Sequence, residues 1–277
     1  MRNSLTAVLA ILSLGLFSCQ KEVDDVFSGN NTGGNSGGTR LVRIGTRVGT
    51  DSITTDFTYN NSGKLNNISY AGSYSGIPLT ANVSIVRSAS NIITSTITKS
   101  DAYASVGVDS VVTNCVYDAT NSRYKYTVAS YLEFGVLNRD SVVFNYSSGK
   151  LVCAIDYYDD GSGYEVDNKD SVYYNGSNIS SMKIFTYNGS SFDLDSETDY
   201  EQYDSKINPL FFAEDAPILG MNTFYPANNA VQRTIIDYTT GDSGTAVFTY
   251  SYNASNRPTK AVSVSGSQTS TSTYYYQ

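Results

Sequence analysis

The sequence predicts an all-β protein: an antiparallel meander of repeated hairpins that forms one large curled or barrel-like sheet, with a two-sheet sandwich as the alternative. Three observations predict this class. After the first 40 residues, short segments of Val, Ile, Thr, Tyr and Phe alternate with turn clusters of Gly, Asn and Ser. The same part of the chain shows no long helical periodicity. A tyrosine-containing turn also recurs along the chain.

Residues 1–18 resemble a secretory signal peptide. Arg2 supplies the positive charge, and the apolar stretch 5–17 is shorter than the ~20 residues that span a bilayer. The stretch ends in Leu-Phe-Ser-Cys at 16–19, which resembles the lipobox of bacterial lipoproteins, although Phe stands where a small residue is usual. The resemblance implies that Cys19 is acylated, that cleavage falls between Ser18 and Cys19, and that this lipid anchors the chain in the outer membrane.

Residues 19–39 are expected to form a tether. Glu22, Asp24 and Asp25 follow the cysteine closely, which resembles the surface-export signal of Bacteroidota lipoproteins. We therefore expect display at the cell surface, with the periplasmic face as the alternative. Residues 28–39 contain only Gly, Asn, Ser and Thr, so they form a flexible linker. About 20 such residues reach ~25 Å, which holds the domain off the membrane.

Residues 40–277 suit a single β-repeat domain, since all-β domains run to ~250 residues. Each repeat reads as strand, polar turn and strand, and Gly or Asn supplies the positive φ that hairpin turns need. The copies are Tyr59–Leu65, a weaker one at Val83–Ile93, Tyr117–Asn121, Tyr146–Leu151, Tyr174–Ile179, Tyr203–Ile207 and Tyr250–Arg257. Seven units predict roughly 14 strands, and a sheet of that size must curl, split or close.

Alternation within a repeat predicts which side chains share a face. Val142, Phe144 and Tyr146 are expected on one face, and Leu151, Cys153, Ile155 and Tyr157 together on one face of the next strand. The 24 tyrosines suit a sheet with a thin core, because each ring buries ~150–250 Å² while its hydroxyl stays wet. A platform that stacks on carbohydrate is the alternative role.

Residues 206–229 interrupt the repeat. They contain Pro209, Pro217 and Pro226, which disfavour regular central strands, and many apolar side chains. We expect this insertion to form a loop or short helix that plugs one mouth of the curled sheet or covers its open face. A binding lid is the functional alternative.

The repeats resemble the Tyr-Asp repeats of Rhs-type proteins, with Lys64 or Lys150 in place of the usual arginine. A closer resemblance is to uncharacterised Bacteroidota lipoproteins that share a domain of unknown function. The C-terminal motif carries it: Tyr-Asp-Ser-Lys-Ile-Asn-Pro-Leu at 203–210, then Asn228-Asn229, then a final hairpin around 250–259. This resemblance implies an extracytoplasmic β fold and brings no catalytic residues.

Composition excludes several function classes. The chain has no histidine, which removes Ser-His-Asp triads, Cys-His pairs and His-ligated metals. The motif Gly241-Asp242-Ser243-Gly244 resembles a serine-protease motif, but without a histidine base it is expected to be a hairpin turn. Eighteen basic and 26 acidic residues give a net charge of −8, which disfavours nucleic-acid binding.

Two groups of carboxylates are candidate cation sites. The first consists of Asp193, Asp195, Glu197, Asp199 and Glu201. On a regular strand all five would line one face, where they form a cation site, an acid/base pair or a charged edge strand. The second, an incomplete EF-hand pattern, consists of Asp156, Asp160, Gly161 and Asp167; a solvated hairpin loop is the default, with Ca²⁺ binding as the alternative.

Cysteines and short Asp-Ser-aliphatic triplets leave further alternatives open. Cys115 and Cys153 form either one disulfide in an oxidising compartment or two buried thiols. The triplets that begin at Asp51, Asp109, Asp140 and Asp170 resemble an O-glycosylation acceptor of this phylum and also suit turns at the start of strands.

The sequence as a whole predicts a lipid-anchored envelope protein without enzymatic activity or cofactor. It would bind polysaccharide or protein, or serve a structural role. The alternatives are a histidine-free, carboxylate-dependent glycoside hydrolase and a Ca²⁺-binding surface protein.

Overall fold

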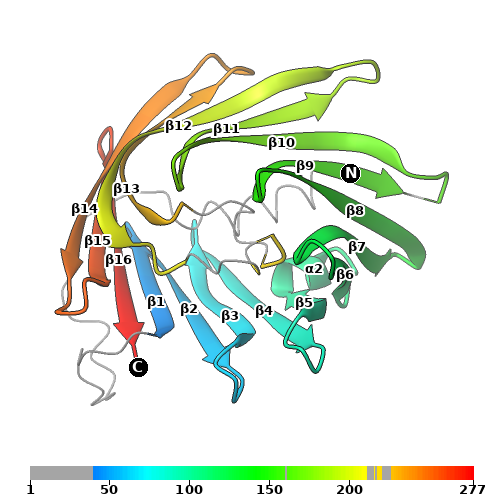
Figure 1. Cartoon of the computed structure of the whole chain (residues 1–277), viewed down its shortest axis with the longest axis horizontal. Coiled ribbons are helices and arrows are strands. Elements are labelled where there is room, and N and C mark those ends of the chain that lie inside the picture. Colours follow the sequence, from blue (N-terminus) through cyan, green and yellow to red (C-terminus); the bar gives the residue numbers. More distant parts are fainter. Residues whose placement is uncertain (1–39, 160, 211–214, 216, 220–225) are drawn as a thin grey trace.

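The computed structural model describes residues 40–159, 161–210, 215, 217–219 and 226–277, and they form one closed barrel of 16 antiparallel strands (Figure 1). Each strand pairs with its neighbours in sequence, and β1 pairs with β16 to close the sheet. The predicted all-β meander is therefore confirmed in its barrel-like form, and the two-sheet sandwich is not formed. The signal peptide, Cys19 and the linker lie outside the described residues.

The strands are long enough for a deep barrel. Their bounds are β1 Leu41–Val48, β2 Asp51–Tyr59, β3 Leu65–Tyr74, β4 Ile77–Arg87, β5 Ile93–Ser100, β6 Val111–Asp118, β7 Arg123–Glu133, β8 Val136–Ser147, β9 Lys150–Asp159, β10 Glu165–Asn175, β11 Asn178–Tyr187, β12 Phe192–Ile207, β13 Asn228–Asp237, β14 Ser243–Tyr252, β15 Pro258–Ser265 and β16 Gln268–Tyr276. The short helix α2 (Asp101–Ser105) lies between β5 and β6. Among the described residues, no helix is long and apolar enough to cross a membrane.

The two ends of the barrel are built from different connections. The tyrosine turns, beginning with the one between β2 and β3, lie at the end where Arg40 and Gln277 exchange backbone hydrogen bonds. We call this the terminal end and the opposite one the rim end. The seven repeats correctly account for β2 to β15. The expected number of strands was too low because β1 and β16 join through the closure of the barrel rather than through a tyrosine turn.

Tyrosine hydroxyls tie neighbouring strands together at the terminal end. In five hairpins the tyrosine near the end of the even-numbered strand donates to a carbonyl near the start of the preceding strand. These bonds, 2.6–3.0 Å long, are Tyr59 to Leu41, Tyr174 to Leu151, Tyr203 to Ile179, Tyr250 to Ala230 and Tyr276 to Pro258. In β4, Arg87 takes the tyrosine position, and its Nε donates to the carbonyl of Leu65 over 3.0 Å. These five tyrosines thus have a structural role.

The hydrophobic core fills the interior at the terminal end. Its buried side chains come from strands around the barrel and include Ile68, Ile93, Tyr124 and Ile179. The insertion also contributes three of its described residues, which are Leu210, Ile218 and Leu219. These three apolar side chains therefore pack inside the barrel wall, and most of the predicted plug lies outside the described residues.

A buried ion pair fixes the insertion to the wall. The guanidinium of Arg87 lies 2.9 Å from a carboxylate oxygen of Asp215, and the two side chains are 5% and 9% exposed. The Tyr124 hydroxyl donates to the other carboxylate oxygen over 3.3 Å and accepts from the Ile93 amide over 2.9 Å. Since unpaired buried charges are costly, these contacts select one position for this part of the insertion.

The motif at 203–210 supports the neck of the insertion. The carboxylate of Asp204 accepts hydrogen bonds from the backbone amide of Lys206, from Asn229 and from the Tyr252 hydroxyl. The amide of Asn208 donates to the carbonyl of Ala227 across the base of the insertion, over 3.0 Å. The residues that carry the resemblance therefore have structural partners.

A β-bulge near the start of β9 changes the expected faces. Asn145 pairs with Cys153, but the next residue of β8, Tyr146, pairs with Leu151. One extra residue on β9 therefore reverses the alternation, so Leu151 faces the core while Cys153 faces outward. The expectation that Leu151, Cys153, Ile155 and Tyr157 share a face was wrong.

Of the two alternatives for Cys115 and Cys153, the disulfide is not formed. Cys115 and Cys153 are both free, with Cys115 packed against the interior core and Cys153 on the outer surface. Their strands, β6 and β9, are separated by two others, which places the backbones ~14 Å apart at ~4.8 Å per strand. Burial raises the pKa of the Cys115 thiol to about 12, so it behaves as a small apolar side chain.

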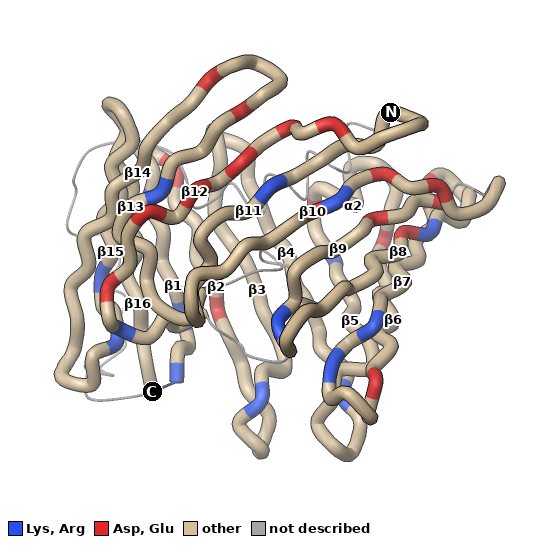
Figure 2. Tube along the Cα trace, turned by 45° about the horizontal axis from the view of Figure 1, so that its top comes forward, with Lys and Arg blue, Asp and Glu red and all other residues tan. Residues whose placement is uncertain are grey.

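The outer wall carries many polar side chains. Arg43 pairs with Asp56 across β1 and β2, Lys183 pairs with Glu197 across β11 and β12, and Asn82 donates to Asn67. Val, Ile and Tyr lie between such residues on β6 to β9. Figure 2 shows acidic residues mostly toward the rim end and basic residues mostly toward the terminal end.

Candidate functional site at the rim

The hairpin between β7 and β8 carries an aromatic residue in an unfavourable turn position. Phe134 and Gly135 have φ values of 50° and 82°, as a two-residue hairpin turn requires. At two other such turns, the residue before glycine is Ser75 or Ser148. A bulky side chain at positive φ is unusual and costs roughly 1–3 kcal/mol, and such residues cluster at functional sites.

This tip exposes four apolar side chains. Leu132, Phe134, Val136 and Leu137 are 57%, 75%, 55% and 44% exposed. Leu132 and Leu137 are Cα partners on one face of the hairpin, Val136 lies on the other face, and Phe134 lies in the turn between the strands. We call these four residues the rim patch. Exposed apolar groups of this kind are typical of interaction sites.

A second, buried cluster supports the rim patch from below. Tyr103 of α2 packs with Val108, Val111 and Tyr131. Ser100 caps α2 by accepting a hydrogen bond from the Tyr103 amide over 3.1 Å. Gly107 has a φ of 76°, and a Cβ there would lie 3.3 Å from the Phe134 ring. The exposed ring is therefore held against a rigid loop on one side and open to solvent on the other.

Three carboxylates line the interior wall below the rim. Asp140 of β8 pairs with Tyr158, Asp156 of β9 pairs with Val142, and Asp170 of β10 pairs with Ala154. Because Cα partners share a face and Val142 and Ala154 belong to the core, Asp156 and Asp170 face inward. Asp140, two residues before Val142 on the same strand, faces inward as well.

Burial and mutual repulsion favour the neutral form of these carboxyl groups. Burial, then repulsion from Asp167, raises the pKa of Asp140 to about 6, although the Tyr131 hydroxyl opposes this by donating to it. Burial, reinforced by Asp170, Asp167 and Asp140, raises the pKa of Asp156 to about 7. Burial alone raises the pKa of Asp170 to about 6. The group can therefore hold and release protons near neutral pH.

The five alternating carboxylates of β12 do not share one face. The register shifts between Ser196 and Leu194, so Asp195 is an extra residue in a bulge. Asp193 then pairs with Thr186, whereas Glu197 pairs with Lys183 on the opposite face of the sheet. Within the described ranges, no group of three or more carboxylate or cysteine side chains is arranged to hold a metal ion.

The other candidate residues from the sequence lie in strands or at a hairpin turn. Asp156 and Asp167 lie in β9 and β10 rather than in an EF-hand loop, and Asp160 lies outside the described residues. The Gly-Asp-Ser-Gly motif lies at the β13–β14 turn, where Ser243 begins β14. The triplets at Asp140 and Asp170 lie inside strands, so the expectation of turns at strand starts was wrong for them.

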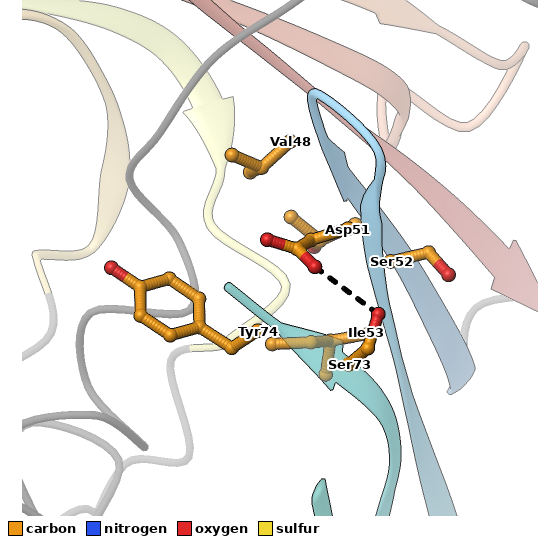
Figure 3. Close-up of a pocket in the computed structure, with 7 residues that line it drawn as sticks. Val48, Asp51, Ser52, Ile53, Ser73 and Tyr74 are labelled. Carbon is orange, nitrogen blue, oxygen red and sulfur yellow. Dashed lines mark hydrogen bonds between the residues drawn. The ribbon is translucent and has the colours of Figure 1, made fainter. Parts of the chain in front are cut away.

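Asp51 stabilises a neighbouring turn at the rim. Its carboxylate accepts a hydrogen bond from the Ser73 hydroxyl (Figure 3). It also accepts hydrogen bonds from the backbone amides of Ser75 and Gly76. These contacts, led by the Gly76 amide, lower the pKa of Asp51. The adjacent depression encloses about 160 Å³ including open solvent, which is too small and too open for a buried ligand.

The sequence reading missed two features of this site. Phe134 was not singled out, although a Phe-Gly pair in a two-residue turn departs from the Ser-Gly pairs elsewhere. Asp140 and Asp170 were noted only as parts of triplets. Their spacing of 30 residues equals one repeat, which places them two strands apart on the same wall, with Asp156 between them.

Comparisons with known proteins identify the fold. No protein-family model and no curated protein sequence matches the chain. A porin-like protein from Bacteroides uniformis aligns with a TM-score of 0.54 and 11% identity, over 87% of this chain and 98% of that one. A porin-like protein from Bacteroides vulgatus aligns with a TM-score of 0.56 and 10% identity, over 86% and 99%. This chain therefore shares its barrel fold with porin-like proteins.

Proposed function

We propose that the chain is a non-enzymatic binding module of the cell envelope, held at the outer membrane by a lipid on Cys19. The barrel stands outside the bilayer on its tether and presents the rim patch to a polysaccharide or protein. It belongs, on this proposal, to the Bacteroidota lipoproteins that its C-terminal motif resembles. The observation that carries the binding role is Phe134, a solvent-exposed ring at a strained turn position.

Two further observations support this arrangement. The outward Arg43–Asp56 and Lys183–Glu197 pairs would be costly in hydrocarbon, which favours a barrel outside the bilayer over one that spans it. The described chain begins at the terminal end with Arg40, so a lipid anchor preceding it leaves the rim on the far side. The similarity to porin-like proteins is compatible with an outer-membrane location.

The substitution Phe134→Asn tests the binding role without damaging the fold. Asparagine tolerates positive φ, so the variant should be as stable as the wild type or slightly more stable. The measurement is the thermal stability of each protein with dextran, mannan or pectin. A polysaccharide present at 100 times its Kd should stabilise the wild type by ~2.7 kcal/mol and leave the variant unshifted.

A matched control removes an apolar side chain from the wall. Val86 is 44% exposed on β4, away from the rim patch, so Val86→Asn should retain the ligand-dependent shift. Equal shifts in wild type and Phe134→Asn would remove the rim patch from the binding surface. If no polysaccharide shifts the wild type, the same variants should be compared for crosslinking to envelope proteins on intact cells.

The interior carboxylates favour a second candidate, a histidine-free hydrolase. Asp156, with a pKa of about 7, has the protonation behaviour of a general acid, and Asp140 and Asp170 lie on the adjacent strands. This candidate predicts turnover of a polysaccharide that Asp156→Asn abolishes and Phe134→Asn weakens. Binding that survives in Asp156→Asn without any turnover in the wild type would favour the binding module.

A further inference from the structure

The terminal end of the barrel carries an excess of exposed positive charge. Among the described residues, eight basic side chains lie at or near its turns, against two carboxylates outside the core, Asp118 and Asp204. The basic residues are Arg40, Lys64, Arg123, Lys125, Lys150, Lys206, Arg257 and Lys260. We call them the basic end; Figure 2 shows the contrast with the acidic rim.

Most of the contacts described for the basic end are made with neutral groups, which do not cancel the positive charge. The Lys206 ammonium donates to the side-chain carbonyl of Asn256 over 2.7 Å, and the Lys150 ammonium donates to the carbonyl of Gly176. Arg123 lies over the ring of Tyr146, 4.7 Å from its centroid. Lys64 aside, Lys125 is the one residue of this set with an ion pair in the described part of the chain, to Asp118 at 3.8 Å. Outward cations elsewhere on the wall, such as Lys183, are paired with carboxylates more closely.

The basic end is also where the described chain begins. Arg40 pairs with Gln277 there, and the 20 or so residues between it and Cys19 can reach ~25 Å. A lipid at Cys19 would keep this end within a tether length of the headgroups. Electrostatic attraction acts over ~8 Å at physiological salt, so a tether of that length allows the contact but does not enforce it.

We propose that the basic end docks on the anionic headgroups of the membrane that holds the lipid anchor. The proposal rests on the proposed acylation of Cys19. Each lysine or arginine near an anionic bilayer contributes ~1 kcal/mol, so three exposed lysines are enough to change the docked population about 10²-fold. Docking would stand the barrel upright, with the rim patch facing away from the membrane.

Neutron reflectometry of the mature, acylated protein on supported bilayers tests this orientation. On phosphatidylcholine containing 30% phosphatidylglycerol, the barrel should lie directly against the headgroups. On pure phosphatidylcholine, or in 0.5 M NaCl, a water layer of up to ~25 Å should separate the two. The charge-reversal variant Lys125→Glu, Lys150→Glu, Lys260→Glu should show that water layer on the anionic bilayer as well.

A variant of equal net charge provides the control. Arg47→Glu, Lys99→Glu, Arg139→Glu changes the same number of charges toward or at the rim and should dock like the wild type. The same water layer for the wild type on both bilayers, or equal loss of docking in the two variants, would overturn the proposal. The proposal would also be overturned if the barrel stayed clear of the anionic bilayer but bound pectin, and if the three lysine substitutions abolished that binding. Mass spectrometry for the acyl group separately tests the anchor, so failure of the anchor and of docking are distinguishable.

Discussion

The two ends of the barrel are built from the same repeated hairpins but carry different kinds of side chains. At the terminal end, tyrosine hydroxyls bond to backbone carbonyls, apolar side chains fill the interior, and the insertion is fixed by Arg87 and Asp215. At the rim end, the interior carries carboxyl groups and the β7–β8 tip exposes apolar side chains. On the proposed function, stability and recognition are separated along the barrel axis, so substitutions at the two ends should have different effects.

The largest expected effect comes from breaking the buried ion pair at the terminal end. Arg87→Ala leaves the Asp215 carboxylate buried without its cation, which should reduce the free energy of unfolding by about 3–5 kcal/mol. Urea denaturation measures this change. Arg43→Ala breaks an outward pair whose side chains are 43% and 36% exposed, and it should cost less than ~1 kcal/mol. Equal losses in the two variants would contradict a terminal end fixed by this contact.

The next effect is a pH dependence located at the rim end. Burial raises the folded-state pKa of Asp156 from 3.8 to about 7, so its protonated form is favoured in the native barrel. That stability is fully present below pH 4 and is lost as the pH rises through 7. Asp156→Asn stays neutral and should therefore be more stable than the wild type by about 2–4 kcal/mol at pH 8, with little difference at pH 4.

Denaturation curves at several pH values measure that difference. Asp51→Asn is the matched control, because hydrogen bonds led by the Gly76 amide lower the pKa of Asp51. Its carboxylate stabilises the fold above the unfolded pKa and loses this role as the pH falls, so the substitution should act in the opposite direction. A wild-type stability that does not change between pH 5 and pH 8 would argue against neutral interior carboxyls.

A smaller effect is expected from a single repeated tyrosine. Tyr203→Phe keeps the ring but removes the 2.7 Å hydrogen bond to the carbonyl of Ile179, which should cost about 1–2 kcal/mol in unfolding experiments. Tyr238→Phe, at the exposed β13–β14 turn, should change stability by no more than ~0.5 kcal/mol. A cost at Tyr203 as small as that at Tyr238 would show that the hydroxyl contacts do not stabilise the terminal end.

The fold was more predictable than the site for a physical reason. Turn chemistry and strand alternation are local, so the repeats around Tyr59, Tyr146 and Tyr174 identified a meander from the sequence alone. Bulges are not visible in that pattern. One extra residue reverses every later side chain, which misplaced Cys153 on β9 and separated Asp193 from Glu197 on β12. The grouping of Asp140 with Asp156 depends on register across strands, which a single sequence does not specify.

One measurement tests most directly whether the barrel stands outside the bilayer on a tether. A specific protease site is introduced within residues 28–39, and washed outer membranes are cleaved in 0.5 M NaCl, which removes electrostatic attachment of the basic end. We expect the folded barrel to appear in the supernatant and the acylated N-terminal fragment to stay with the membrane. A barrel that remains in the membrane after complete cleavage would contradict the tethered arrangement and favour a membrane-spanning one.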